Sequence, residues 1–139
     1  MNFNQTGVAL IVGGSSGMGF ETAKVLAKHN VEVVIVGNNE AKLERALTEL
    51  NAIGQASVIQ VNLYEKQSLQ KLLAYINKPE TNVGYLVNAA GYFSPKPFID
   101  HSEDDYETYM GLNKAMFVIS QAVATNMSHH GGGNIVNIG

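Results

Sequence analysis

Four glycines and two serines in one short segment suit the binding of a phosphate group. The segment reads Gly13-Gly14-Ser15-Ser16-Gly17-Met18-Gly19, in which residues 13, 17 and 19 follow the spacing G-x-x-x-G-x-G. Glycine lacks a Cβ atom and tolerates positive φ, so the chain can turn sharply there and a diphosphate can approach the backbone closely. The serine hydroxyls can donate hydrogen bonds to the same phosphate oxygens. The segment therefore predicts a binding turn for a diphosphate group.

The neighbouring residues place this segment between a strand and a helix. The apolar run Val8–Val12 is typical of a strand that is buried on both faces. From Gly17 the apolar residues follow helical spacing, so the free N–H groups and the positive dipole end of that helix would face the anion. This context favours a dinucleotide-binding turn over a flexible loop. The missing G-x-x-x-x-G-K-[ST] pattern disfavours a P-loop phosphotransferase.

Strands and helices are predicted to alternate along the whole chain. The predicted strands are Val8–Val12, Val31–Val36, Val58–Val61, Val83–Asn88 and Asn134–Ile138. The predicted helices run from Gly17 to about His29, from Glu40 to Asn51, from Glu65 to Ile76, and from a capping box at Ser102 and Asp105 to about Met127. Right-handed crossovers would join these elements into an α/β fold of Rossmann type, a three-layer αβα doubly wound parallel sheet with strand order 3-2-1-4-5. Residues 1–139 are expected to form one domain that holds five strands of this sheet.

Composition excludes several other classes of protein. The chain has no cysteine, which excludes a disulfide scaffold, a thiolate metal site and a cysteine nucleophile. A net charge of -3 without a basic run argues against nucleic acid or a membrane surface as a partner. The segment Met1–Thr6 has no charged region, and the apolar run after it is too short for a signal sequence or a membrane span. We therefore expect a cytoplasmic protein.

Two segments resemble the short-chain dehydrogenase/reductase family. Ala9–Gly19 is similar to the family's opening, which usually carries the turn T-G-x-x-x-G-x-G, although Val12 stands in place of the threonine. Leu86–Gly91 is similar to the family's N-[NA]-A-G segment at the end of the fourth strand. The resemblance covers essentially the whole chain. It implies that the following residues line the cofactor cleft: Asn88, Ala89, Ala90 and Gly91.

The resemblance also implies oxidoreductase chemistry, of which this chain holds one group. Asn113 resembles the helix asparagine of the family's Asn-Ser-Tyr-Lys tetrad and would hold a water in the proton relay. Gly133–Gly139 resembles the fifth family strand, after which the catalytic serine and the Tyr-x-x-x-Lys pair are expected. We therefore expect the cofactor-binding half of a longer enzyme that ends before the last strands and is inactive alone. A stand-alone nucleotide-binding module is the alternative.

The expected cofactor is NAD or NADP, and the residues at the selective positions do not decide between them. Gly37 stands where NAD-type family members often carry aspartate, whereas Asn38 and Ser16 stand where NADP-type members often carry basic residues. Because these positions are uncharged, we expect weak discrimination. Asn62 and Leu63 match the family's Asp-[Val/Leu] pair that contacts adenine, with an amide in place of the carboxylate.

The resemblance implies a small carbonyl or alcohol substrate and a homodimer or homotetramer. Tyr92 and Lys96 fit Y-x-x-x-K, but Pro95 would break the helix on which such a pair must lie. His129 and His130 are adjacent and have no evident third ligand, so they predict the end of a helix and no metal site. Tyr106 and Tyr109 are expected to pack in the last helix, and Lys114 is expected to point away from the face of Asn113.

Overall fold

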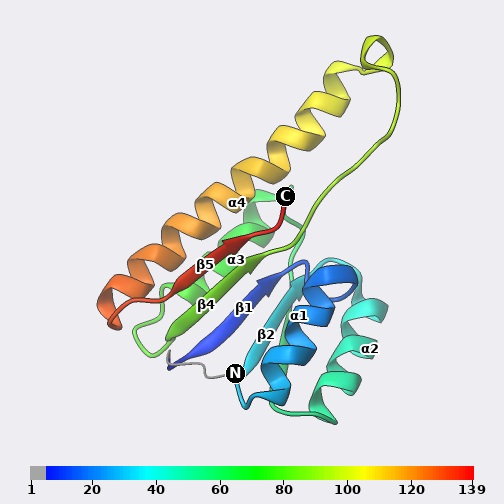
Figure 1. Cartoon of the computed structure of the whole chain (residues 1–139). Helices are drawn as coiled ribbons and strands as arrows, with labels where there is room; N and C mark the ends of the chain where they lie inside the picture. Colours follow the sequence, from blue (N-terminus) through cyan, green and yellow to red (C-terminus); the bar gives the residue numbers. More distant parts are fainter. Residues whose placement is uncertain (1–5) are drawn as a thin grey trace.

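Five apolar segments form the strands of one parallel sheet. The structure of the chain, a computed structural model, describes residues 6–139. Residues 1–5, which belong to the N-terminal segment considered for a signal sequence, lie outside the described residues. The strands are β1 (Val8–Val12), β2 (Val33–Gly37), β3 (Ala56–Gln60), β4 (Val83–Asn88) and β5 (Asn134–Asn137). They pair in the order β3-β2-β1-β4-β5 and every neighbouring pair is parallel, which confirms the predicted order and fold class (Figure 1).

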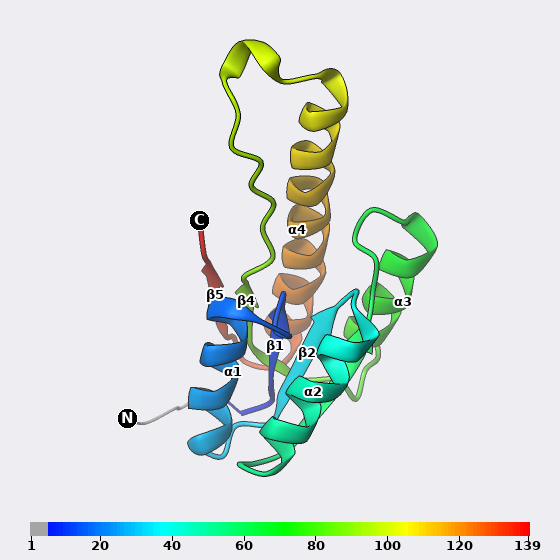
Figure 2. The same cartoon turned by 90° about the vertical axis from the view of Figure 1, so that its right-hand side faces the viewer.

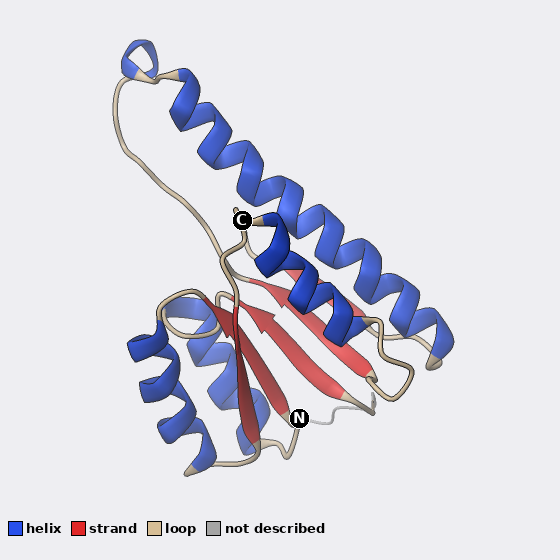
Figure 3. Cartoon of the chain, turned by 180° about the vertical axis from the view of Figure 1, so that it is seen from behind, coloured by secondary structure: helices blue, strands red, loops and turns tan. Residues whose placement is uncertain are grey.

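Helices cover both faces of the sheet. They are α1 (Gly17–Lys28), α2 (Glu40–Asn51), α3 (Lys66–Ile76), α4 (Glu103–His129) and a short 3₁₀ turn, η1 (Phe98–Asp100). The pair α1 and α2 packs on one face, and α3 and α4 pack on the other (Figures 2 and 3). Successive residues of a strand enter opposite cores, so Leu10 lies in the core under α3 and α4, whereas Ile11 lies in the core under α1 and α2. Within residues 6–139, no helix is both long and apolar enough to cross a membrane.

The end of α1 shifts the start of β2 from its predicted position. The sequence predicts a strand from Val31, but the Val31 N–H donates to the Leu26 carbonyl and closes the end of the helix. Asn30 has a φ of 62°, the left-handed conformation that often ends a helix, which confirms the predicted helix end. The first ladder position of β2 is therefore Val33, which pairs with Ala9 of β1.

Other element ends differ from the predicted ones by one or two residues. The strand β3 covers Ala56–Gln60 instead of Val58–Val61, because its pairing with β2 begins at Ala56. Glu65 is the N-cap of α3 and not its first helical residue. The helix α4 continues to His129, beyond the predicted Met127.

The long helix α4 extends past the sheet, and residues 91–101 lie alongside it (Figure 1). Its start is the predicted capping box: the Asp105 N–H donates to Ser102 Oγ at 3.1 Å, and the Ser102 N–H donates to Asp105 Oδ2 at 2.8 Å. Lys96 forms an ion pair with Asp105, and the Ser94 N–H donates to the Tyr109 hydroxyl at 3.0 Å. These bonds attach the segment to the first turns of α4.

The two tyrosines of this region have different environments. Tyr109 packs edge-on against Tyr92 with ring centroids 5.0 Å apart, as expected for a packing residue. Tyr106 is 60% exposed, so the prediction that it packs within the chain is wrong. Tyr106 lines a shallow hollow together with Phe98 and Ile99 of η1, and these two side chains are themselves 90% and 88% exposed, so they do not bury its ring.

A buried asparagine attaches α4 to the rest of the domain. Asn126 is 7% exposed, and its Oδ1 accepts a hydrogen bond from the Val83 N–H at 3.0 Å. Its Nδ2 donates to the Ile76 carbonyl at 2.9 Å and to the Thr81 carbonyl at 2.7 Å. The side chain of Asn126 therefore provides hydrogen-bond partners for backbone groups at the end of α3, in the loop after it and at the start of β4. Sequence reasoning did not identify this residue.

We predict that Asn126→Ala lowers the free energy of unfolding by about 3 kcal/mol, because a buried N–H and two carbonyls lose their partner. The measurement is chemical denaturation followed by circular dichroism. The matched control is Gln121→Ala, on an exposed position of the same helix, which should change stability by less than about 0.5 kcal/mol. Equal effects of the two substitutions would contradict the role given to Asn126.

A second prediction concerns the pH dependence of the α4 start. The hydrogen bond from Lys96 and the one from the Ser102 backbone lower the pKa of Asp105 to about 2. The unfolded pKa is higher, at about 3.9, so the carboxylate stabilises the fold above pH 4 and this stabilisation is lost as the pH falls toward 2. Asp105→Asn should lower Tm at pH 6, and its difference from the wild type should shrink steadily below pH 4.

The control for this titration is Asp104→Asn, since Asp104 lies in the same first turn and takes part in none of the ion pairs of residues 6–139. This variant removes a carboxylate from the same turn and keeps the ion pair of Lys96 with Asp105, so it should not reproduce the pH profile of Asp105→Asn. If both variants show the same pH profile, the ion pair with Lys96 is not the cause.

Candidate functional site

A cavity of about 500 Å³ lies where the carboxyl ends of β1, β2 and β4 meet. Open parallel sheets bind ligands at this edge, where neighbouring strands connect to helices on opposite faces. Most of the predicted binding residues line the cavity: Gly13, Ser15, Ser16, Gly17, Met18, Asn38, Asn62, Leu63, Ala89, Ala90 and Gly91. Two predicted residues, Gly19 and Asn88, are buried beside the cavity and do not line it.

Two glycines of the turn allow it to pack against the end of β4. Gly13 has a φ of 84°, and a Cβ atom there would lie 2.5 Å from the Ala90 nitrogen. A Cβ atom on Gly19 would collide with the Gly13 carbonyl oxygen and press on the Ala89 side chain. Contacts within the chain are therefore sufficient to require glycine at these two positions.

Gly17 differs, because the space beside it is open. Its φ is 60°, and no atom lies within 4 Å of the position that a Cβ atom would take. Gly17 is the first residue of α1, and the N-cap residue Ser16 makes no side-chain cap hydrogen bond. The first N–H groups of a helix have no partner within the helix. This end of α1 therefore offers backbone donors, a hydroxyl and free space to an anionic group.

The segment after β3 forms the far wall of the cavity. Asn62 Oδ1 accepts from the Tyr64 N–H at 3.0 Å, and Asn62 Nδ2 donates to Glu65 Oε1 at 3.2 Å. The side chain thus holds the turn before α3, while one acceptor lone pair and one N–H of the amide are left for a ligand. The Tyr64 ring lies against Gly111 of α4, and burial together with the Tyr92 phenol raises the pKa of Tyr64.

Sequence reasoning missed six residues that line the cavity: Val36, Asn39, Lys42, Val61, Tyr64 and Leu112. Tyr64 and Leu112 lie at the α4 side, and Lys42 lies at the α2 side. Tyr64 follows the predicted pair at 62 and 63, and Leu112 precedes Asn113. Both could therefore have been identified as neighbours of predicted site residues. Their approach to the cavity depends on how α2 and α4 pack, which no local pattern shows.

Asn113 lines a second hollow, next to the end of β5. This hollow of about 460 Å³ is also lined by Asn88, Ser120 and Asn137. Asn88 Nδ2 donates to Ser120 Oγ at 3.0 Å and to Asn137 Oδ1 at 2.7 Å, so Asn88 joins β4 to α4 and β5. Asn88 Oδ1 is buried and has no hydrogen-bond partner among the described residues. The hollow therefore gathers amide and hydroxyl groups beside the last strand of the chain.

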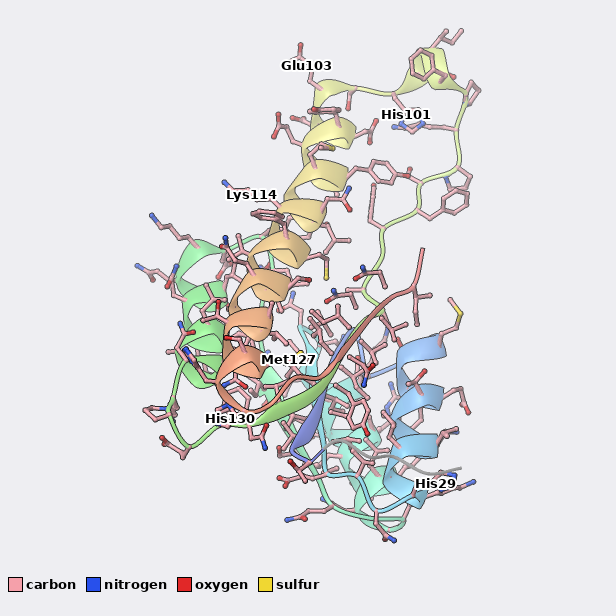
Figure 4. All side chains as sticks on the ribbon, turned by 60° about the vertical axis from the view of Figure 1, so that its left-hand side comes forward. His29, His101, Glu103, Lys114, Met127 and His130 are labelled. Carbon is pink, nitrogen blue, oxygen red and sulfur yellow. The ribbon has the colours of Figure 1, made fainter. Side chains whose placement is uncertain are left out.

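The residues that were expected to have no chemical role lie outside the cavity and the second hollow. The backbone of residues 92–97 is not helical, and Lys96 pairs with Asp105, which confirms that Tyr92 and Lys96 do not share a helix face. Figure 4 shows Lys114 projecting from α4 and shows His29, His101 and His130 at separate places in the molecule. Within residues 6–139, no group of three or more histidine, cysteine, aspartate or glutamate residues could hold a metal ion.

The fold and the position of the cavity define a doubly wound α/β protein with its site at the carboxyl edge of the sheet. The family model described as short chain dehydrogenase matches residues 7–139. The chain therefore belongs to the short-chain dehydrogenase family, which confirms the resemblance of the two glycine-containing segments.

Sequence relatives match nearly the whole chain with about half of their own length. Gluconate 5-dehydrogenase of Gluconobacter oxydans (strain 621H) is 34% identical over 132 residues, which cover 94% of this chain and 52% of that protein. The 5-keto-D-gluconate 5-reductase of Escherichia coli (strain K12) is 30% identical over 131 residues, which cover 93% of this chain and 52% of that protein. The chain spans about half the length of the curated relatives it matches.

Solved structures of the family share the fold closely. A short-chain dehydrogenase from Sphingobium yanoikuyae in complex with NADPH superposes with a TM-score of 0.88 at 26% identity, covering 96% of this chain and 53% of that one. The bulky-bulky ketone specific alcohol dehydrogenase from Comamonas testosteroni gives a TM-score of 0.88 at 27% identity, covering 98% of this chain and 55% of that one. The likeness supports the Rossmann-type fold assigned from the sequence.

The open space at Gly17 gives a prediction for dinucleotide binding. Gly17→Val would place a branched side chain at the start of α1 and should weaken dinucleotide affinity tenfold or more, at least about 1.4 kcal/mol. Calorimetric titration measures this change. Because valine also strains a backbone with positive φ, the variant should lose about 1–3 kcal/mol of stability as well.

Gly131→Val separates the two effects. Gly131 has a φ of 88° with no atom within 4 Å of the position that a Cβ atom would take, and it lies in the turn before β5, outside the cavity. This variant should lose comparable stability and keep its dinucleotide affinity. Unchanged affinity in a folded Gly17→Val protein would refute the assignment of the turn.

Proposed function

We propose that the protein carrying this chain is an NAD(P)-dependent oxidoreductase that moves hydride between the nicotinamide and a carbonyl or secondary alcohol. The observation that carries the proposal is the cavity at the start of α1, where Gly17 leaves open space beside unpartnered helix N–H groups. The family of the chain and the NADPH complex of the Sphingobium yanoikuyae structure support this choice of ligand.

The residues that line the cavity fit a dinucleotide. The diphosphate would lie at Ser15, Ser16 and Gly17, where the backbone donors and hydroxyls are. The adenine would lie at Asn62 and Leu63, on the wall formed by the segment after β3. The small side chains at the end of β4, on residues 89–91, leave room for the ribose and the nicotinamide. When bound, NAD(P) supplies or accepts the hydride at C4 of the nicotinamide.

Asn113 is the one member of the proton relay that we assign to this chain. Its place beside Asn88, Ser120 and Asn137 supports a role in holding a water near the end of β5. The general acid, the residue that polarises the carbonyl and the lysine of the relay would come from outside residues 1–139. The chain by itself would therefore bind the cofactor without turning over a substrate.

Two relatives suggest which substrates to try. Gluconate 5-dehydrogenase and 5-keto-D-gluconate 5-reductase share 34% and 30% identity with this chain. Keto-sugar acids are accordingly the first compounds to test, followed by bulky ketones, for which the Comamonas testosteroni enzyme is specific.

The proposal includes a homodimer or homotetramer in which α4 packs against another copy. The support is a set of exposed apolar side chains along this helix: Tyr106, Met110 and Phe117, which are 60%, 44% and 68% exposed. Exposed apolar side chains that recur along one helix in this way are typical of an interface.

The test follows NAD(P)H absorbance with keto-sugar acids and bulky ketones, for the full natural protein and for the 139-residue chain. We expect turnover by the full protein and none by the chain, with dinucleotide binding by both. Steady turnover by the chain, abolished by Tyr92→Phe, would show that Tyr92 is catalytic after all. Dinucleotide binding without turnover by the full protein would favour a nucleotide-binding module.

In the full protein, Asn113→Ala should lower kcat roughly a hundredfold, in the range lost when a proton-transfer group is removed, and leave cofactor affinity unchanged. Lys114→Ala is the matched control, because Lys114 is the exposed neighbour on α4 and lines neither hollow. A parallel loss of kcat in both variants would indicate a general disturbance of α4.

A further inference from the structure

Lys42 is the one charged residue that lines the cavity within the described part of the chain. It lies in the first turn of α2, next to the end of β2 at Gly37 and Asn38. Its backbone position is fixed, because its N–H donates to the side chain of the N-cap residue Asn39 at 3.0 Å. The side chain of Lys42 therefore extends from a fixed backbone position at the edge of the cavity.

A smaller hollow of about 180 Å³ adjoins the cavity and shares three of its residues. Ser15, Ser16 and Lys42 line both spaces, and Arg45 lies in the smaller one, one helical turn after Lys42. The residues common to both spaces are thus two hydroxyl donors and one cationic side chain, and the smaller hollow adds the second cation, Arg45. Such a group of donors suits a phosphate with two negative charges.

Within the described part of the chain, neither Lys42 nor Arg45 forms an ion pair. The ion pairs of residues 6–139 are Lys24 with Glu21 and Asp105 with Lys96 and His101, and they involve neither Lys42 nor Arg45. Glu49 is the single acidic residue that lines the smaller hollow. Because Glu49 is four residues beyond Arg45 on α2, it lies near Arg45 and about two turns from Lys42.

The end of β2 carries no group that would repel a phosphate. Gly37 has no side chain, and a Cβ atom there would lie 3.1 Å from Ser15 Oγ and 3.2 Å from Leu43 Cδ2. A side chain at this position would require small shifts of the Ser15 hydroxyl and of Leu43. NAD-selective sites use an acidic residue at this place to bind the ribose hydroxyls, and this chain has none.

We infer that Lys42, with the hydroxyls of Ser15 and Ser16 and support from Arg45, binds the 2′-phosphate of NADP and makes the protein NADP-selective. This inference rests on the proposed function and gives the same cavity its specificity. It replaces the weak discrimination expected from the uncharged residues Ser16, Gly37 and Asn38, since the positive charge comes from α2. The sequence alone does not place Lys42 there.

The experiment measures Kd values of NADPH and NADH by fluorescence titration of the full natural protein. NADPH should bind at least roughly tenfold more tightly than NADH, as expected for a charge-assisted contact at a partly exposed site. Lys42→Gln should remove most of that difference by weakening NADPH roughly tenfold, with NADH changed less than about twofold. Because the attraction is screened by ions, the NADPH preference should also shrink as salt is raised.

The matched control is Lys71→Gln, which removes an exposed lysine from α3, away from both hollows. It should leave both Kd values unchanged. Adenosine 2′,5′-bisphosphate should compete with NADPH in the wild type and lose potency in Lys42→Gln, whereas 5′-AMP should behave alike in both.

The outcomes separate this inference from the proposed function. Equal binding of NADH and NADPH, or a Lys42→Gln protein that keeps its NADPH preference, overturns the inference and leaves the oxidoreductase proposal intact. A protein that binds neither dinucleotide overturns both. An equal loss of NADPH affinity in the Lys71→Gln control would assign the effect to net charge and also overturn the role of Lys42.

Discussion

The close contact between the turn after β1 and the end of β4 is the constraint on which the site depends. Gly13 and Gly19 leave no room for a Cβ atom, because Ala89, Ala90 and the turn's own carbonyl occupy that space. This contact sets the start of α1 at the carboxyl edge of the sheet, with Gly17 facing open space. Larger residues at these positions would move the helix end and the strand end apart, and the cavity between them would lose its shape.

On the other half of the sheet, the buried side-chain amides of Asn126 and Asn88 hold neighbouring elements together. Asn126 joins α4 to the end of α3 and the start of β4, and Asn88 joins β4 to α4 and β5. Each side chain bonds across elements that are far apart in the sequence. Their satisfied donors fix the long helix that carries Leu112 to one hollow and Asn113 to the other. Polar groups buried in this way favour one arrangement of the helix, since any shift would leave them unpaired.

Local patterns were sufficient for the strands and for the helices α1 to α4, although not for the 3₁₀ turn η1. Buried strands gave continuous apolar runs, α2 and α3 gave stripes at helical spacing, and the capping box at Ser102 and Asp105 marked the start of α4. The errors lie at element ends, as at Val31, where a hydrogen bond to Leu26 keeps the residue in the turn. Tyr106 shows the second kind of error, because apolar character alone does not say whether another element covers a side chain.

The sequence by itself determined the family, the parallel sheet and the glycine turn, because these follow from residue types at fixed local spacing. Only the tertiary structure decided which residues meet across the cavity. It brought Lys42 of α2 and Tyr64 to the walls of the cavity at the glycine turn, and it placed Asn88 in the hollow of Asn113 instead. The physical reason is that these contacts depend on the packing of helices against the sheet, and that packing is set by side chains distant in the sequence.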